Sequence, residues 1–291
     1  MFLFEERGVV LFDAALGTAL IAAGQPKGTG SEDMNNSAPE TVLGIHLENI
    51  KAGSDVVSSN TFGISQMMAR GDRDGALLTL EKAVGIAKKA ASLAEERTVF
   101  ACLDIGPTGA MLGPLGDTSY EKAEEFFAGQ AEAGTRAGAD FILLETFGDP
   151  EEFAHAARAA ARVSDLPVLG TMTFGEGGRS FMGASPEDLI QIARAEKLSA
   201  TGLNCTLTPE EMIPVITKIL SLADGLPVIA QPNAGQPVFE DGKSVYKTTT
   251  EAFVAGAAKL LSLGVSGIGG CCGTTPEIIS AIRDIIDRRY K

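Results

Sequence analysis

Short apolar runs alternate with helical patterns along nearly the whole chain. The apolar runs read as strands and cover residues 9–12, 55–60, 99–105, 141–144, 167–174 and 228–233, with two more leading to Cys205 and Cys271. Helical patterns follow these runs, with starts at Ser37-Ala38-Pro39-Glu40, about residue 75, near Ser119, near Pro150, at Ser185, at Thr208, about residue 250 and after Thr275. The polar stretch through Gly28, Gly30, Asn35 and Asn36 reads as a long loop. The pattern predicts eight strand–helix units in succession.

Near-continuous apolar strands are typical of a parallel sheet that is buried on both faces. Eight such units close into a (β/α)8 barrel, the TIM barrel of the α/β class. A doubly wound open sheet is the alternative, but it commonly has fewer strands and a nucleotide-binding fingerprint. Neither G-x-G-x-x-G after the first strand nor G-x-x-x-x-G-K-[ST] occurs here. No linker divides the chain, so we expect one barrel domain over residues 1–291.

The composition narrows the classes of partner. The net charge of −14 argues against nucleic acid and against an anionic membrane surface. No apolar run approaches the roughly 20 residues that span a bilayer, and the first residues do not resemble a signal peptide. Four cysteines, two of them adjacent, are not typical of a disulfide framework. We therefore expect a cytoplasmic protein with reduced thiols.

The glycine-rich stretch at residues 267–277 carries two adjacent thiols, Cys271 and Cys272, between a buried strand and a helix start. Such a pair can form a strained vicinal disulfide, pack as small apolar residues or bind a metal. Cys205 also follows an apolar run and precedes a helix start, so a parallel sheet would bring all three thiols to one edge. Three protein ligands with one open position are typical of catalytic zinc. Cys102 lies within an apolar run, and we expect it in the core.

The predicted ligand set favours one kind of chemistry. Three thiolates around Zn²⁺ give a site of net charge −1, which is a poor Lewis acid for splitting water. A thiol substrate in the fourth position would lose its proton to the metal and remain electron-rich. These thiolates therefore indicate alkyl transfer to sulfur rather than hydrolysis.

Polar residues at the carboxyl ends of the other predicted strands complete the candidate site. They are Asp13, Asn60, Asp104, Glu145 and Asn233. The first three could equally be turn formers or helix caps. Glu145 follows four apolar residues, where a carboxylate needs a partner, and it could bind a cation such as an amino-acid ammonium. We expect structural roles for His46 and His155, because both lie within helical patterns.

Residues 269–277, Gly-Gly-Cys-Cys-Gly-Thr-Thr-Pro-Glu, together with Asn204-Cys205, resemble the signature of the zinc-dependent homocysteine S-methyltransferases. Supporting segments extend the resemblance over nearly the whole chain. Residues 145–149 and 172–180 look most like the homocysteine module of cobalamin-dependent methionine synthase. The betaine-using branch has an aromatic residue where this chain has Thr146, and Ala14 stands where glycine is usual, which would narrow the pocket.

The resemblance implies a (β/α)8 barrel in which Cys205, Cys271 and Cys272 hold zinc and the homocysteine sulfur is the fourth ligand. It also implies that Glu145 binds the amino group of homocysteine and that Asp13 lies beside the same site. The implied product is methionine.

The methyl donor is the open part of this expectation. The first candidate is methylcobalamin presented by a corrinoid protein or module and not stably bound by this domain alone. Residues 28–36 and 109–118 are long enough to act as a lid or docking surface. The alternative donor is a small sulfonium compound such as S-methylmethionine. A third reading, a zinc-binding or redox-sensing barrel without catalysis, requires a fourth protein ligand that the sequence does not supply.

Overall fold

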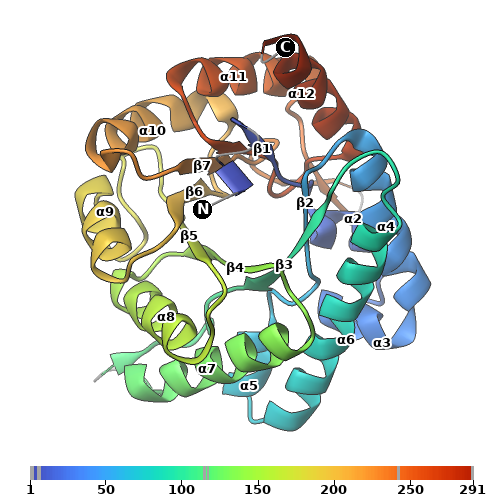
Figure 1. Ribbon diagram of the computed structural model, residues 1–291, viewed down its shortest axis with the longest axis vertical. Coiled ribbons are helices and arrows are strands. Elements are labelled where there is room, and N and C mark those ends of the chain that lie inside the picture. Colours follow the sequence, from blue (N-terminus) through green and yellow to red (C-terminus); the bar gives the residue numbers. More distant parts are fainter. Residues whose placement is uncertain (1–2, 5–7, 114–115, 117, 241–242, 290–291) are drawn as a thin grey trace.

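A ring of parallel strands forms the centre of the computed structural model, which describes residues 3–4, 8–113, 116, 118–240 and 243–289. The eight strands pair in the order β1-β10-β7-β6-β5-β4-β3-β2, and helices surround them (Figure 1). This arrangement confirms the predicted (β/α)8 barrel. The barrel strands are β1 (Val10–Leu11), β2 (Val56–Ser58), β3 (Phe100–Ile105), β4 (Phe141–Phe147), β5 (Val168–Met172), β6 (Ala200–Asn204), β7 (Val228–Gln231) and β10 (Gly267–Ile268).

The helices of the outer layer begin close to the predicted starts. Ser119, Ser185 and Thr208 each accept a hydrogen bond from a backbone N–H of the first helical turn, which stabilises the helix start. None of the helices in the described part of the chain is long and apolar enough to cross a bilayer. The outer helices are α4 (Pro39–Ala52), α6 (Arg73–Ser92), α7 (Tyr120–Arg136), α8 (Pro150–Val163), α9 (Pro186–Ala195), α10 (Pro209–Ala223), α11 (Thr250–Leu263) and α12 (Pro276–Arg289).

Every second residue of a barrel strand points into the ring. Cys102 on β3 and Phe141 and Leu143 on β4 belong to one apolar cluster of this interior. Cys102 is fully buried there, as predicted. The same alternation brings Asp104 and Glu145 inward, one layer nearer to the carboxyl ends of their strands. The interior is therefore apolar at the amino end and polar at the carboxyl end.

The prediction of a long loop through residue 36 was wrong. The stretch contains α2 (Leu16–Ala22), a 3₁₀ turn η1 (Ser31–Asp33) and α3 (Met34–Ser37). These pieces are only seven, three and four residues long, so none is long enough to show a helical period in the sequence. Leu20 and Met34 are nevertheless buried against apolar side chains of α4.

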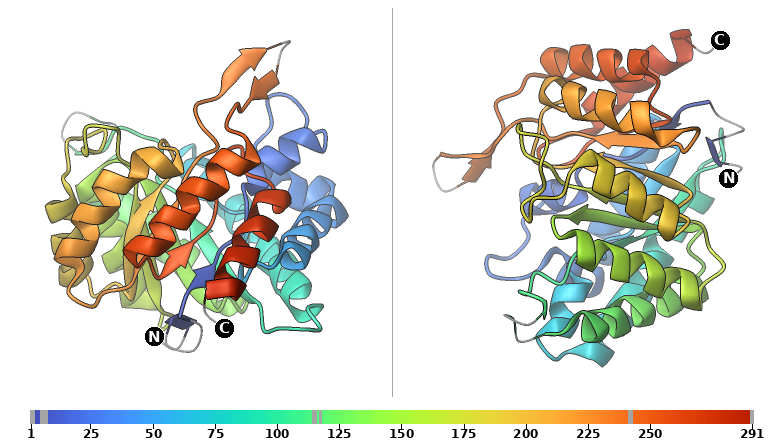
Figure 2. Two further views of the ribbon diagram at one scale, coloured as in Figure 1. Left: turned by 90° about the horizontal axis from the view of Figure 1, so that it is seen from above. Right: turned by 90° about the vertical axis from the view of Figure 1, so that its left-hand side faces the viewer.

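Two further elements extend the predicted pattern. The short helix α5 (Ile64–Ala69) follows β2 and precedes α6. An antiparallel hairpin of β8 (Val238–Glu240) and β9 (Lys243–Val245) lies between β7 and α11. The hairpin projects from the side of the barrel opposite the labelled chain ends (Figure 2). Of the predicted loop at 109–118, residues 114, 115 and 117 lie outside the described residues.

One backbone hydrogen bond and several side-chain contacts close the barrel between β1 and β2, where no ladder pairing is present among the described residues. The Asp55 N–H donates to the Leu11 carbonyl at 2.7 Å, and the Leu11 N–H donates to Asp55 Oδ2 at 2.9 Å. Arg283 of α12 donates to the same carboxylate oxygen at 2.6 Å. Further along the seam, Asp13 accepts two hydrogen bonds from Ser58. Carboxylates thus replace part of a backbone ladder.

Candidate active site

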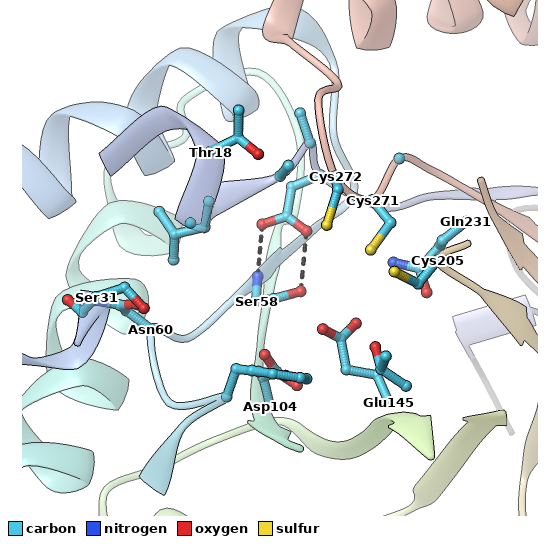
Figure 3. Close-up of a pocket in the computed structure, with 18 of the residues that line it drawn as sticks. Thr18, Ser31, Ser58, Asn60, Asp104, Glu145, Cys205, Gln231, Cys271 and Cys272 are labelled. Carbon is cyan, nitrogen blue, oxygen red and sulfur yellow. Dashed lines mark hydrogen bonds between the residues drawn. The ribbon is translucent and has the colours of Figure 1, made fainter. Parts of the chain in front are cut away.

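Polar side chains from several strands meet in a cavity of about 350 Å³ at the carboxyl end of the barrel (Figure 3). The structure brings most of the predicted site residues together around it. Asn233 is absent from this wall, but it is buried beside the cysteine turn. The predicted residues that line the cavity are Asp13, Asn60, Asp104, Glu145, Cys205, Cys271 and Cys272.

Three sulfur atoms converge on one side of this cavity. The Sγ atoms of Cys205, Cys271 and Cys272 all lie within 4.8 Å of one another (Figure 3). A tetrahedral zinc with Zn–S bonds of 2.3 Å separates its sulfur ligands by about 3.8 Å. The three thiols are free and half-buried, so they can reach this geometry with small side-chain movements. The donor set therefore fits zinc, with the fourth side facing the cavity.

The end of β7 fixes both cysteine-bearing turns. The Cys205 N–H donates to the Gln231 carbonyl at 3.0 Å, and the Cys271 N–H donates to the Pro232 carbonyl at 2.8 Å. The Ala234 N–H in turn donates to the Cys272 carbonyl at 2.9 Å. One rigid strand end thereby sets the separation of thiols that lie 66 or more residues apart in the sequence.

Gly273 lets the hairpin segment cover the second cysteine turn. Its φ is +79°, and an added Cβ would lie 2.2 Å from the ring of Tyr246. Only glycine tolerates this backbone conformation and this close approach without strain. Burial, followed by the charge of Cys272, raises the pKa of Tyr246 to about 12. Tyr246 follows β9, so the segment after the unpredicted hairpin packs against the cysteine turn.

The three thiols have very different pKa values. Hydrogen bonds from the Cys271 and Cys272 thiols lower the pKa of Cys205 to about 3. The hydrogen bond to Cys205 is correspondingly the leading reason why the pKa of Cys272 rises to about 11 and the pKa of Cys271 rises well above its usual value. The cluster therefore accommodates one negative charge easily and further charges only with a cation present.

Three carboxyl groups face the same cavity. Burial raises the pKa of Asp13 to about 7, although hydrogen bonds from Ser58 oppose the shift. Burial, followed by the charges of Cys205 and Asp13, raises the pKa of Glu145 to about 8. Burial is also the first reason why the pKa of Asp104 lies well above its usual value, with Glu145 and Asp13 adding to it. This is an environment that favours a cationic ligand.

Asn204 fixes the position of Glu145. Its Oδ1 accepts hydrogen bonds from the Thr146 N–H at 2.8 Å and from Thr171 Oγ1 at 2.9 Å. Its Nδ2 donates to Thr146 Oγ1 at 2.7 Å and lies 3.5 Å from Glu145 Oε2. The β4–β5 register shifts at this point. In the sequence, Asn204 stands out only as the neighbour of Cys205. Its position as a polar residue at an inward-pointing strand position is the feature that could have indicated its role.

Left-handed backbone conformations surround the same centre. The φ angles of Thr146, Cys205 and Thr206 are +63°, +62° and +58°. Such angles are uncommon for residues other than glycine, especially for β-branched ones such as threonine, and cost of the order of 1–3 kcal/mol each. The strain is maintained by side-chain contacts such as the 2.6 Å hydrogen bond between the hydroxyls of Thr173 and Thr206.

Asn60 holds the segment that covers the other side of the cavity. Its Nδ2 donates to the Ser31 carbonyl at 2.7 Å and to Asn35 Oδ1 at 3.0 Å, while Asn35 Nδ2 donates to the Asn60 carbonyl at 2.8 Å. The buried Glu32 carboxylate accepts the Gly63 N–H at 2.6 Å. These contacts fix η1 and α3 over the end of β2.

The site residues also lie within a segment that matches a known protein family. A family model described as "Homocysteine S-methyltransferase" matches residues 10–286, which include every predicted site residue. This chain belongs to the homocysteine S-methyltransferase family. It is accordingly an enzyme of the methyltransferase class.

Relatives of this family member include free-standing enzymes of similar length. "Homocysteine S-methyltransferase 2" of Arabidopsis thaliana is 29% identical over 286 residues, which cover 87% of this chain and 85% of the relative. "Selenocysteine Se-methyltransferase" of Brassica oleracea var. italica is 28% identical over 98% of this chain and 91% of the relative. "Methionine synthase" of Mycobacterium tuberculosis is 30% identical over 95% of this chain but only 25% of the relative.

A solved structure supports the fold of this homocysteine S-methyltransferase family member. The metallated form of the homocysteine methyltransferase MmuM from Escherichia coli superimposes with a TM-score of 0.81 and covers 98% of both chains. Its sequence identity is 23%, so the likeness concerns the barrel architecture.

Proposed function

We propose that this protein transfers a methyl group to the thiol of homocysteine and forms methionine, with zinc held by Cys205, Cys271 and Cys272. The observation that carries this proposal is the convergence of three thiols, within 4.8 Å of one another, beside a cavity lined by carboxylates. The free thiols also favour a reducing compartment such as the cytoplasm.

Zinc, when bound, would supply a homocysteine thiolate at neutral pH. The chain itself would orient the amino acid. Glu145 would bind the homocysteine ammonium, because its carboxylate faces the cavity and Asn204 and Thr146 fix its position. Asp13 would add negative charge beside it. Asn233, whose amide hydrogen-bonds to the Cys205 sulfur, would steady that thiolate, and Asn60 would shape the wall on the side of Ser31.

A methylated corrinoid on a partner protein is one candidate donor. The similarity to part of methionine synthase supports it. Large apolar side chains are also exposed on the segments after β3, β5 and β7: Met111 (70%), Phe181 (92%) and, on β8, Phe239 (76%). Exposed large apolar side chains are typical of a protein docking face. A corrinoid protein docked there would present its methyl group to the cavity.

A small sulfonium compound such as S-methylmethionine is the second candidate donor. The chain matches most of the length of two free-standing relatives but about a quarter of the methionine synthase. The acidic lining of the cavity also suits a cation.

The proposed function is tested by incubating the zinc-loaded protein with homocysteine and with each donor in turn and measuring methionine. Methionine formation that requires zinc and homocysteine is the expected result with one of the two donors. Cob(I)alamin appearing with methylcobalamin would identify the corrinoid. If the zinc-loaded protein binds no homocysteine and forms no methionine from either donor, the proposed function is wrong.

A further inference from the structure

All three cysteines of the proposed zinc site face the cavity that would admit the substrates. Cys205, Cys271 and Cys272 line it, and Figure 3 shows their sulfur atoms directed into it. With zinc bound, each cysteine would be a thiolate, and so would the homocysteine sulfur. Thiolates are nucleophiles, so a methyl donor in the cavity would have four sulfur atoms within reach. The site must therefore distinguish the substrate sulfur from its own ligands.

Methylation of a ligand would inactivate the site. The cysteine sulfur would form a bond to the methyl carbon, and the bond between that carbon and the donor would break with its electron pair on the donor. The product is a neutral thioether, which no longer supplies a negative charge to hold zinc. A lower nucleophilicity at the three cysteines would prevent this loss.

Tyr246 donates a hydrogen bond to one of these sulfur atoms, that of Cys272. A chain of polar groups sets the direction of this bond. The Gly273 N–H donates to Thr18 Oγ1 at 3.2 Å, and the Thr18 hydroxyl donates to the Tyr246 oxygen. The ring of Tyr246 packs closely against Gly273, which fixes its position. The tyrosine hydrogen is therefore left to point at the sulfur.

The other two sulfur atoms have donors of their own. Asn204 Nδ2 donates to Cys271 Sγ at 4.0 Å. The Asn233 amide and the Thr206 N–H hydrogen-bond to the sulfur of Cys205. Both asparagine side chains are buried, so water does not compete for these contacts. Each of the three sulfur atoms thus has a neutral donor supplied by the protein.

The side-chain donors reach the sulfur atoms from outside the cavity. None of Asn204, Asn233 and Tyr246 is among the described residues that line it. A substrate sulfur that completes the site from the cavity therefore receives none of these three hydrogen bonds. A hydrogen bond to a thiolate stabilises its charge and lowers its basicity, and nucleophilicity falls with basicity. The arrangement makes the three ligand sulfurs weaker nucleophiles than the substrate sulfur.

We propose that Tyr246, Asn204 and Asn233 direct methylation to the substrate sulfur, because their hydrogen bonds lower the nucleophilicity of the three cysteine thiolates. This inference rests on the proposed function, adds specificity-determining residues to it and holds for either methyl donor. In the transfer the homocysteine thiolate forms the new carbon–sulfur bond, and the donor keeps the electron pair of the bond that breaks. The proton of the homocysteine thiol is released when the thiol binds. The three residues act through the cysteines and are positioning residues.

The test compares the wild-type protein with Tyr246→Phe, which keeps the ring and removes the hydrogen-bond donor. Each zinc-loaded protein is treated with excess methyl iodide, with and without homocysteine, and peptide mass spectrometry measures the methylation rate of each cysteine. Methylation of Cys272 should be about 3- to 10-fold faster in the variant, since a hydrogen bond to a charged group is lost and roughly half of its free energy affects the rate. The rates at Cys205 and Cys271 should change less than about twofold, because their donors remain.

Tyr120→Phe is the matched control, because the Tyr120 hydroxyl donates to Asp149 at 3.0 Å rather than to a cysteine. It should be methylated as the wild type is. Metal analysis measures the zinc content of every variant. If Tyr246→Phe retains less zinc, Thr18→Val replaces it in the comparison, because this change keeps Tyr246 and removes the hydroxyl that orients it. A smaller rise, again confined to Cys272, is expected there.

Two results would overturn this inference alone. An unchanged methylation rate at Cys272 in a variant with full zinc content would show that the hydrogen bond does not control its nucleophilicity. An equal rise at all three cysteines would show a general loosening of the site. In both cases the wild-type protein still forms methionine with zinc and homocysteine, so the proposed function survives. A wild-type protein that retains no zinc would refute the proposed function and this inference together.

Discussion

The carboxylate of Asp13 accepts both hydrogen bonds that Ser58 can donate, with the backbone N–H at 2.8 Å from Oδ2 and the hydroxyl at 3.0 Å from Oδ1. The two residues lie on either side of the β1–β2 seam, where the described residues form no strand ladder. The same carboxylate lines the cavity. Closure of the barrel and preparation of the site therefore depend on one side chain.

Ser58→Ala should destabilise the protein. It leaves a buried carboxylate oxygen without its donor, at a cost of about 1–3 kcal/mol in the free energy of unfolding. Chemical denaturation measures this change. Ser54→Ala is a matched control, because the Ser54 hydroxyl is fully buried with no partner among the described residues. It should be neutral or stabilising, and equal losses in both variants would contradict the assigned role of Ser58.

Cys272→Ala should abolish tight zinc binding and methyl transfer while leaving the barrel folded. The remaining two thiols provide too few ligands for a closed coordination shell. Metal analysis after dialysis and circular dichroism would measure both properties. Cys102→Ala changes a buried thiol outside the cluster and should retain full zinc content. A metal-free Cys272→Ala enzyme with full activity would refute the zinc mechanism.

Glu145→Gln should weaken homocysteine binding about 10- to 100-fold, because it removes the charge that is proposed to bind the ammonium. Zinc content should stay at the wild-type level. Calorimetric titration of the zinc-loaded protein with homocysteine measures the effect, with the exposed Glu176→Gln as control. Unchanged affinity would show that the ammonium binds elsewhere.

His46 should make the folded protein sensitive to acid. It is fully buried in α4, and burial lowers its pKa from 6.5 to about 4. Between these values the unfolded chain binds a proton that the folded chain excludes, so stability falls as the pH drops from 6.5 toward 4. The loss amounts to about 3 kcal/mol. Urea unfolding at several pH values should show a shallower decline over this window in His46→Leu; an unaltered decline would assign it to other groups.

The sequence was sufficient for the barrel and for the gathering of the site residues. Each strand is a short apolar run, and N-cap residues such as Ser119, Ser185 and Thr208 mark the helix starts. Parallel strands end at one face, so residues at the strand ends had to meet there. The three cysteines and the carboxylates were found by this rule alone.

Other features depend on contacts that no sequence period records. The hairpin strands are short and exposed, so they lack the alternation of a half-buried sheet. The role of Asn204 depends on a register shift in the neighbouring strand β4. The β1–β2 seam depends on Asp55, whose carboxylate accepts hydrogen bonds from both Leu11 and Arg283, two residues that are far from it in the sequence. These relationships are tertiary, and local propensity does not encode them.

The left-handed residues Thr146 and Thr206 have a consequence for laboratory evolution. Glycine at either position would relax a conformation that threonine adopts at a cost of about 1–3 kcal/mol. A selection for heat resistance alone should therefore recover glycine there early. The selected variants would have a higher melting temperature but would position Glu145 and Cys205 less firmly. Substitutions at these two positions should therefore raise the melting temperature and lower the turnover number.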